Sequence, residues 1–255
     1  MTVYEHPAFP QPVDTNAKIW RYMDFGKFVS LAETKRLYMR RADLFLGDEF
    51  EGTTPAGEIE RWRQLAASAA TPEDRAAIEY NRAELSGYAK HFRQNYFVSC
   101  WNMADAENVA MWERYAPQPE SVCLVSRYST LGRLLNHEVV NYGMVRYIDY
   151  QTDQLPSMNM LQLISHKRHF YRDETEVRAV MLAIAPEPIV SEHIAPFMMP
   201  DGCGWAPPID VFALVEGVVL HPKATPDFAI LVAEFCAAHL LPAPVSSQMS
   251  AKPVF

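Results

Sequence analysis

The segment Tyr96-Phe97-Val98-Ser99-Cys100-Trp101 is a short run of aromatic and β-branched residues. Such residues suit a pleated, half-buried surface, so the run predicts a β-strand that ends where polar residues begin. On its N-terminal side, residues 57–95 carry helical spacing, with a break and restart at Thr71-Pro72. A threonine cap followed by proline at the first helical position is a typical helix start. The sequence therefore predicts a helical insertion that leads directly into a strand.

Strands and helices alternate irregularly on either side of this segment. Further strands are predicted at residues 19–23, 36–40, 121–126, 139–150, 176–184 and 211–220. Helices are predicted at residues 25–34, 157–170 and 226–240, with a short one capped by Asp105 that carries Met111 and Tyr115. Because the strands do not form a regular βαβ series, the predicted class is α+β.

The length of 255 residues suits one large core with an insertion. We therefore expect a single domain over residues 19–240, which contains the insertion at residues 57–95. Prolines crowd residues 1–18 and 241–255 and disfavour continued helix or sheet. Both ends are accordingly predicted to be flexible, an N-terminal arm and a C-terminal tail.

The composition and charge exclude several classes of protein. Apolar residues make up 49% and charged residues 21%, which excludes a disordered chain or a fibre. The formal charge of −8 opposes broad adhesion to nucleic acid or to an anionic membrane. No apolar run is long enough to cross a bilayer, and no leader pattern is present, so a cytoplasmic location is expected. Four scattered cysteines predict neither a disulfide scaffold nor a zinc knuckle.

Known phosphate-binding and nucleophile motifs are absent, and the acidic pair Glu174 and Glu176 is the main chemical signal. Residues two apart on a strand face the same side, so these carboxylates would repel each other unless a cation offsets them. Their proximity would raise the pKa of one, which suits a carboxylate that holds or takes a proton. The alternative is a solvated corner in which Arg172 and Arg178 balance the acids.

Two other segments add groups that suit a dinucleotide. Arg21 lies between the aromatic residues Trp20 and Tyr22, and Ser99 lies in an aromatic strand that ends at Trp101. An arginine fork suits a phosphate or ribose, a serine hydroxyl suits a ribose edge, and a carboxylate suits a sugar hydroxyl. Each residue also has an ordinary explanation, as a cation–π contact, a surface group or a packing residue.

The chain resembles the bacterial family filed as domain of unknown function two-nine-seven-one, over roughly residues 19–222. The resemblance rests on Trp20-Arg21-Tyr22, residues 31–38, Asp48-Glu49-Phe50-Glu51-Gly52, residues 97–101, Met111-Trp112-Glu113-Arg114-Tyr115, Lys167 and Glu174-Thr175-Glu176-Val177-Arg178. The order of arginine, strand serine and Glu-x-Glu is in turn similar to the R-S-E class of ADP-ribosyltransferases. That similarity implies a split β-sheet that binds NAD.

The resemblance also implies a role for individual residues. Arg21 would anchor NAD, Ser99 would contact the nicotinamide ribose, Glu176 would be the catalytic glutamate and Glu174 would activate the acceptor. Tyr22, Trp101, Trp112 and Tyr115 complete the expected cofactor-binding set. The sequence departs from the pattern in two places, because Cys100-Trp101 follows Ser99 where the class has Ser-Thr-Ser, and Arg178 can pair with Glu176. Arg178 would then either orient that carboxylate or occupy it.

The remaining polar and aromatic groups allow more than one reading. Trp112 and Tyr115 share a helical face and form either core or an aromatic wall for a base. Asp48 and Glu51 suit a turn or a substrate contact. His166 and His169 lack a third ligand nearby, so no metal site is predicted. The basic stretch from Lys167 to Arg178 is either a solvated face or a phosphate contact.

The leading hypothesis is an NAD-dependent ADP-ribosyltransferase or NAD glycohydrolase, which would act as a bacterial toxin or anti-phage effector on a protein or nucleic-acid acceptor. A second hypothesis is a non-catalytic module of the same fold that binds a nucleotide or a protein. A third is a metal-dependent nuclease that uses Glu174, Glu176 and either Asp48 or Glu51.

Overall fold

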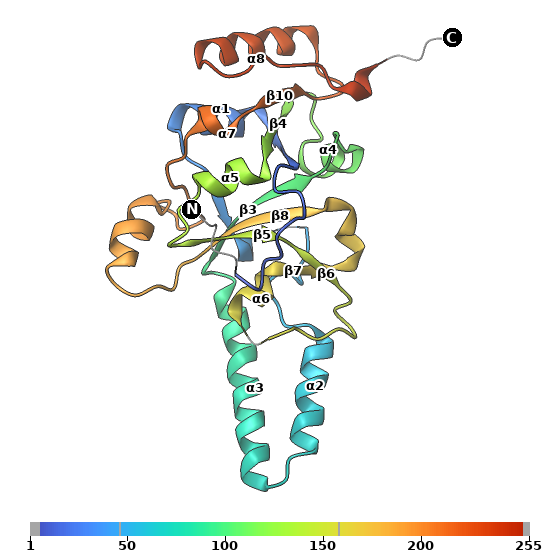
Figure 1. Cartoon of the computed structure of the whole chain (residues 1–255), viewed down its shortest axis with the longest axis vertical. Coiled ribbons are helices and arrows are strands. Elements are labelled where there is room, and N and C mark those ends of the chain that lie inside the picture. Colours follow the sequence, from blue (N-terminus) through green and yellow to red (C-terminus); the bar gives the residue numbers. More distant parts are fainter. Residues whose placement is uncertain (1–5, 46, 158, 252–255) are drawn as a thin grey trace.

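A computed structural model, which describes residues 6–45, 47–157 and 159–251, is built around an antiparallel sheet (Figure 1). Its strands are β1 (Lys18–Asp24), β2 (Met39–Arg41), β3 (Tyr96–Met103), β4 (Ser121–Arg127), β5 (Val140–Met144), β8 (Glu176–Leu182), β9 (Gly204–Trp205) and β10 (Gly217–Leu220). A separate parallel pair consists of β6 (Arg146–Ile148) and β7 (His166–Arg168). The expected α+β class is confirmed.

The sheet divides at β3, because two strands share one edge of it. β1 pairs with β3 only at Ile19↔Met103 and Trp20↔Asn102, and it then continues along β4, which pairs with β10. β2 pairs with the other half of the same β3 edge, while the opposite edge pairs with β8 along its length. The sheet therefore splits into β10-β4-β1 and β5-β8-β3-β2-β9. We call the point beyond Trp20↔Asn102, where β1 and β3 part, the fork.

Helices cover the sheet and form the expected insertion. They are α1 (Phe25–Thr34), α2 (Ala56–Ala67), α3 (Pro72–Phe92), α4 (Val109–Tyr115), α5 (Tyr128–Leu134), α6 (Met160–Ser165), α7 (Val211–Leu214) and α8 (Pro226–Ala238), with short turns η1 (Ala42–Leu44), η2 (His169–Glu174), η3 (Val190–Ile194), η4 (Ala195–Phe197) and η5 (Gln248–Ser250). Thr71 caps α3 by accepting from the Asp74 amide at 3.0 Å. α2 and α3 project from the sheet as a hairpin (Figure 1).

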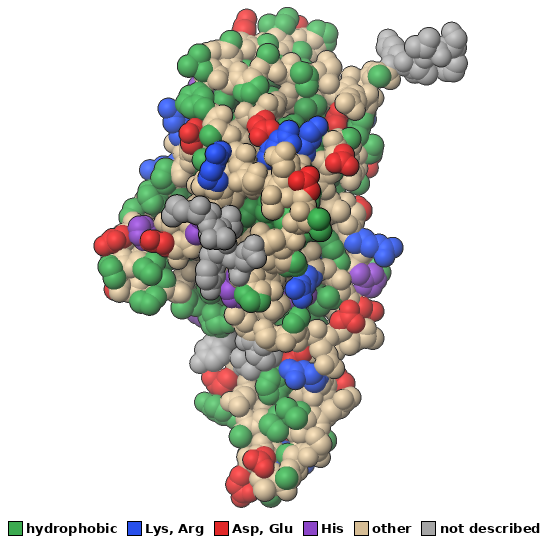
Figure 2. Space-filling model, viewed as in Figure 1, with side chains coloured by type: hydrophobic (Ala, Val, Ile, Leu, Met, Phe, Trp, Pro, Cys, Tyr) green, Lys and Arg blue, Asp and Glu red, His purple; other side chains and the backbone are tan. Residues whose placement is uncertain are grey.

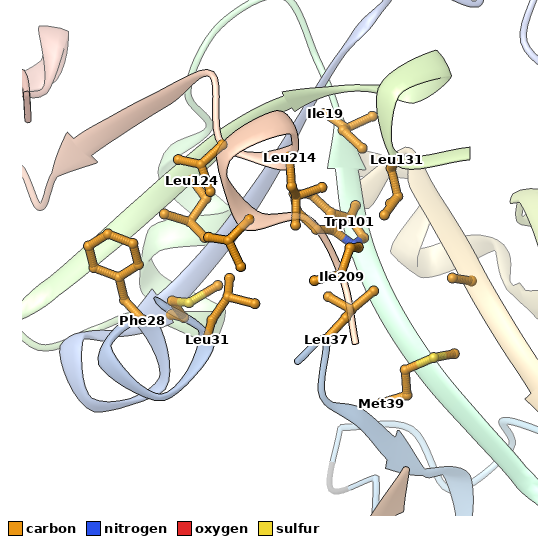
Figure 3. Packing of buried hydrophobic residues seen from close by; sticks show 14 of the residues in the cluster. Ile19, Phe28, Leu31, Leu37, Met39, Trp101, Leu124, Leu131, Ile209 and Leu214 are labelled. Carbon is orange, nitrogen blue, oxygen red and sulfur yellow. The ribbon is translucent and has the colours of Figure 1, made fainter. Parts of the chain in front are cut away.

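Strand alternation sends successive side chains to two different layers of core. Trp101 of β3 and Val177 of β8 face the larger layer, where Trp101 lies among Leu131, Ile209 and Leu214 (Figure 3). The intervening residues of β3 and β8 face the opposite layer, where Val98 and Val180 pack with Leu161 and Ile164 of α6. Among the described residues, no helix has the length and apolarity needed to cross a membrane.

Some predicted elements differ from the structure for local reasons. Residues 211–220 form α7 followed by β10, because the Asp210 side chain caps a helical turn by accepting from the Ala213 amide. The helix predicted at residues 157–170 is limited to α6, after which the chain turns extended and pairs with β6. The short helix begins at Asn108, whose side chain accepts from the Ala110 amide, instead of at Asp105.

The described parts of both ends pack against the sheet, whereas loose arms were expected. Phe9 is 1% exposed, and Pro10 accepts a hydrogen bond from the Met144 amide at 2.8 Å. At the other end, Val245 exchanges hydrogen bonds with the β10 backbone, and Ser247 is buried. Proline-rich chain still packs as an extended strand-like segment when it lies at a sheet edge. Residues 1–5 and 252–255 lie outside the described residues.

Candidate functional site

Solvent reaches the sheet at the fork. Arg21 of β1 and Cys100 of β3 are partly exposed, although the strand residues on either side of each are buried. The Arg21 guanidinium donates from Nη2 to the Tyr38 carbonyl at 3.0 Å and lies 5.5 Å from the centroid of the Trp101 ring. Burial lowers the pKa of Arg21 to about 10, an effect that Cys100 partly offsets, so the side chain stays cationic at neutral pH. A fixed arginine therefore stands at an accessible break in the sheet.

Cys100 links the fork to the acidic pair. It lies opposite Arg178 in the β3–β8 register and on the same face as Glu176. Burial and the negative charge of Glu176 raise the pKa of the Cys100 thiol, so it remains protonated and faces that carboxylate as a donor group. Arg21 and Cys100 are also close enough to interact electrostatically.

Behind Cys100 lies a buried charge cluster made of Glu51, Glu174, Glu176, Lys167 and Arg178. The Lys167 ammonium contacts all three carboxylates, with Nζ 3.0 Å from Glu51 Oε1, 2.5 Å from Glu174 Oε2 and 3.1 Å from Glu176 Oε2. Burial of such charges is costly unless each is paired and hydrogen-bonded.

Arg178, which is fully buried, closes the other side of the cluster. Its Nε donates to Glu176 Oε1 at 2.6 Å, and its Nη2 donates to Glu51 Oε1 at 2.9 Å. The remaining Nη1 donates to the Ile164 carbonyl at 2.7 Å. Each guanidinium nitrogen therefore has a partner, and the arginine holds Glu176 in one orientation.

The cluster drives the pKa values of the two glutamates apart. Burial raises the pKa of Glu174, and the charge of Glu176 adds to this, while Lys167 opposes it. Burial would also raise the pKa of Glu176, but the charges of Arg178 and Lys167 outweigh it and hold the pKa well below the ordinary value. Glu176 is thus the fixed anion at neutral pH, and Glu174 is the carboxylate that takes a proton more readily.

Glu174 is also held by two residues of α4. Arg114 donates from Nη1 to Glu174 Oε1 at 2.6 Å, and the Tyr115 hydroxyl donates to the same oxygen at 2.8 Å. Tyr115 is 46% exposed, so it lies where the cluster meets solvent. Trp112, predicted with Tyr115 as a possible aromatic wall, is instead buried and donates to Glu107 at 3.0 Å.

Ser99 does not reach this site. It is 1% exposed and accepts a hydrogen bond from Trp101 Nε1 at 3.1 Å within the larger core layer. Tyr22 is likewise a core residue, with its ring 4.9 Å from Trp112. The structure therefore brings Tyr115 and the glutamates together at the buried cluster, leaves Arg21 at the fork on the Trp101 face of the sheet, and turns Ser99, Tyr22 and Trp112 into the core. Trp101 supports Arg21 from the core side.

Sequence reasoning overlooked Cys100 and Arg114. Asn102 pairs with Glu176, and Cys100 pairs with Arg178. Because strand side chains alternate, the even-numbered residues of β3 share the face of Glu176, so Cys100 lies on that face and Ser99 does not. That register is not written in the sequence. Arg114 lies in the quoted segment at residues 111–115, but only the placement of α4 beside η2 shows its contact with Glu174.

The cluster gives little support to a metal site. The Lys167 ammonium occupies the centre of the three carboxylates, and Asp48 pairs with Arg168 at 2.8 Å. His166 binds the Gln162 carbonyl through Nδ1 at 2.7 Å, whereas His169 packs on Phe170. Within residues 6–45, 47–157 and 159–251, no group of three or more His, Cys, Asp or Glu side chains is arranged to hold a metal ion.

Comparisons with family models and with curated proteins give no match. They therefore do not identify the family that the sequence resembles. Solved structures of DarT from Thermus sp. 2.9 are similar at 8% identity. The complex with NAD+ matches with a TM-score of 0.38 over 94% of this chain and 98% of that chain. The complex with ADP-ribosylated ssDNA matches with a TM-score of 0.38 over 95% and 98%.

Proposed function

We propose that the protein binds NAD at the fork and cleaves it, transferring ADP-ribose to an acceptor or to water. The observation that carries the proposal is the partly open break in the sheet, where Arg21 is partly exposed on the Trp101 face and Cys100 is partly exposed on the face of an ionised Glu176. An arginine fork suits the NAD pyrophosphate, and a buried anion suits the ribose that becomes positive. The proposal includes a cytoplasmic location, as predicted from the sequence.

The chemistry assigns distinct roles to the two glutamates. In the reaction the bond between ribose C1′ and the nicotinamide nitrogen breaks, and nicotinamide leaves with the bonding electrons. Glu176, held as an anion by Arg178 and Lys167, stabilises the positive charge that develops on the ribose. The acceptor lone pair then forms the new bond to C1′, and Glu174, with its raised pKa, takes the acceptor proton.

A second function is favoured by one feature of the cluster. Both oxygens of Glu176 are engaged, Oε1 by Arg178 at 2.6 Å and Oε2 by Arg178 at 3.0 Å and Lys167 at 3.1 Å. A carboxylate so fully engaged also suits a module that binds a nucleotide without cleaving it. The two functions differ in product, since only the enzyme releases nicotinamide.

Calorimetric titration with NAD and a nicotinamide-release assay separate the two functions. Binding with release supports the transferase or glycohydrolase, and binding without release in the presence of bacterial lysate, which supplies acceptors, supports the module. Absence of NAD binding would reject both the enzyme and an NAD-binding module. The effector role is tested by induced expression in a bacterial host, where growth arrest by the parent and normal growth with Glu176→Gln are expected.

A further inference from the structure

A ridge of alternating aromatic and arginine side chains runs outward from the cluster. We define it by Tyr115, Arg114, Tyr171, Arg168 and Phe50. The guanidinium carbons of Arg114 and Arg168 each lie 5.6 Å from the centroid of the Tyr171 ring, and that of Arg168 lies 4.4 Å from the Phe50 ring. Flat cationic and aromatic groups are thus placed side by side along one surface.

The ridge exposes more aromatic surface than its packing requires. Tyr115 is 46% exposed and Phe50 is 40% exposed, and Phe170, next to Tyr171 in η2, is 72% exposed. Exposed apolar side chains that lie together, as opposed to ones scattered singly, mark an interaction site.

Buried and backbone groups hold the ridge in place. Arg168 pairs with the buried Asp48 at 2.8 Å, and the Tyr171 hydroxyl donates to the Gly47 carbonyl at 2.9 Å. Arg114 is fixed by Glu174 at 2.6 Å. A surface whose side chains are already ordered loses little further freedom when it binds a ligand.

A cavity of about 360 Å³ lies at the Phe50 end of the ridge. The Phe50 and Tyr150 rings form two of its walls, with their centroids 6.0 Å apart and their planes at 84°. Thr53, Thr54 and Gln151 add hydroxyl and amide groups to its lining, and Glu49 adds a carboxylate that can accept from the amino group of a base. Aromatic walls with a few polar groups suit a flat heterocycle that carries hydrogen-bonding edges.

From these features we propose that the ridge binds a single-stranded nucleic acid, with one base in the cavity. Bases stack on exposed rings, and arginines interleaved with the rings add cation–π and phosphate contacts. On the face seen in Figure 2, Lys and Arg stand in small groups among Asp and Glu, unlike the continuous basic field that a duplex binder uses. A single strand, whose bases are free to stack, therefore fits this surface better than a duplex.

The ridge also determines which acceptor the enzyme would modify. This part of the inference rests on the proposed function. Its Tyr115 end contacts Glu174, the carboxylate assigned to take the acceptor proton. A strand on the ridge would place one of its nucleophilic groups beside the ribose of bound NAD.

Fluorescence anisotropy with labelled oligonucleotides of mixed sequence, about 16 nucleotides long, tests the surface. Single-stranded DNA and single-stranded RNA are separate arms, and the same DNA as a duplex is the competitor. We expect at least one single strand to bind roughly tenfold more tightly than the duplex, and Phe50→Ala to weaken that binding roughly tenfold through lost stacking. Phe212→Ala, which removes a ring that is 51% exposed on α7, is the matched control and should bind as the parent does.

Equal binding of duplex and single strands, or unchanged binding by Phe50→Ala with an unchanged melting temperature, would overturn the proposal. If Phe50→Ala lowers the melting temperature, Phe50→Leu replaces it, because leucine keeps apolar bulk at this position while it removes the aromatic ring, and the same loss is expected. NAD titration of the parent is run in parallel. Strand binding without NAD binding rejects the proposed function alone, and NAD binding without strand binding rejects the ridge alone.

Discussion

Arg178 and Glu176 lie two residues apart on the same face of β8, and Arg178 Nε donates to Glu176 Oε1 at 2.6 Å. The pairing explains how a carboxylate that is almost completely buried keeps its charge, since the guanidinium offsets the cost of burial and lowers the pKa. The same guanidinium reaches Glu51, so one side chain organises two acids of the cluster.

Removal of Arg178 should therefore destabilise the protein strongly. Arg178→Met leaves Glu176 and Glu51 buried with less compensation, and we expect the free energy of unfolding to fall by about 3–5 kcal/mol. Urea denaturation followed by circular dichroism measures this. Arg63→Met is the control, because its ion pair with Glu60 is exposed, and it should unfold as the parent does. Equal stability of Arg178→Met and parent would show that the cluster is not a paired network.

Acid should weaken the fold through Glu176. Its pKa is lowered in the folded state, so its contribution to stability is present above the unfolded value of about 4.5 and is lost as pH falls toward the folded pKa. The unfolding free energy of the parent should drop over that range, and the drop should be smaller in Glu176→Gln. Parallel pH profiles for the two proteins would contradict the lowered pKa.

Cys100 should matter because its thiol is the donor group that faces Glu176. Cys100→Ser keeps a donor at this position, whereas Cys100→Val removes it at similar volume. We expect Cys100→Val to slow nicotinamide release roughly tenfold and Cys100→Ser to retain most of it, with similar melting temperatures. Equal rates for the two variants would remove Cys100 from the site.

Arg21 and Ser99 should give opposite results, although the sequence places both in the cofactor set. Arg21→Gln should weaken NAD binding by roughly tenfold or more, because a charge-assisted contact is lost. Ser99→Ala should leave NAD binding unchanged and lower the free energy of unfolding by about 1 kcal/mol, because Trp101 Nε1 loses its acceptor. Calorimetric titration and urea denaturation measure the two effects. Weak NAD binding by Ser99→Ala would contradict the assignment of Ser99 to the core.

The predicted elements that carry strong local signals agree with the structure. The strand at residues 96–101 and the helix that starts at Thr71-Pro72 rely on side-chain shape and capping, which act within a few residues. Residues 211–220 were assigned to one strand because apolar runs look alike in a buried turn of helix and in a strand.

The site itself depended on information that one sequence does not hold. The Glu-x-Glu pair was evident, but its partners Lys167, Glu51 and Arg114 come from separate elements and meet only in the folded chain. Whether Ser99 or Cys100 faces Glu176 depends on the register between β3 and β8. A shift of that register by one residue would exchange the two side chains.

Nicotinamide release from NAD by the parent and by Glu176→Gln tests the role of Glu176 most directly. Bacterial lysate is supplied as a source of acceptors, and the melting temperature of each protein is measured. Glu234→Gln, the same change at an exposed position of α8, is the control. We expect release by the parent and by Glu234→Gln, and a loss of roughly a hundredfold or more in a folded Glu176→Gln. Full release by a folded Glu176→Gln would contradict this role of Glu176.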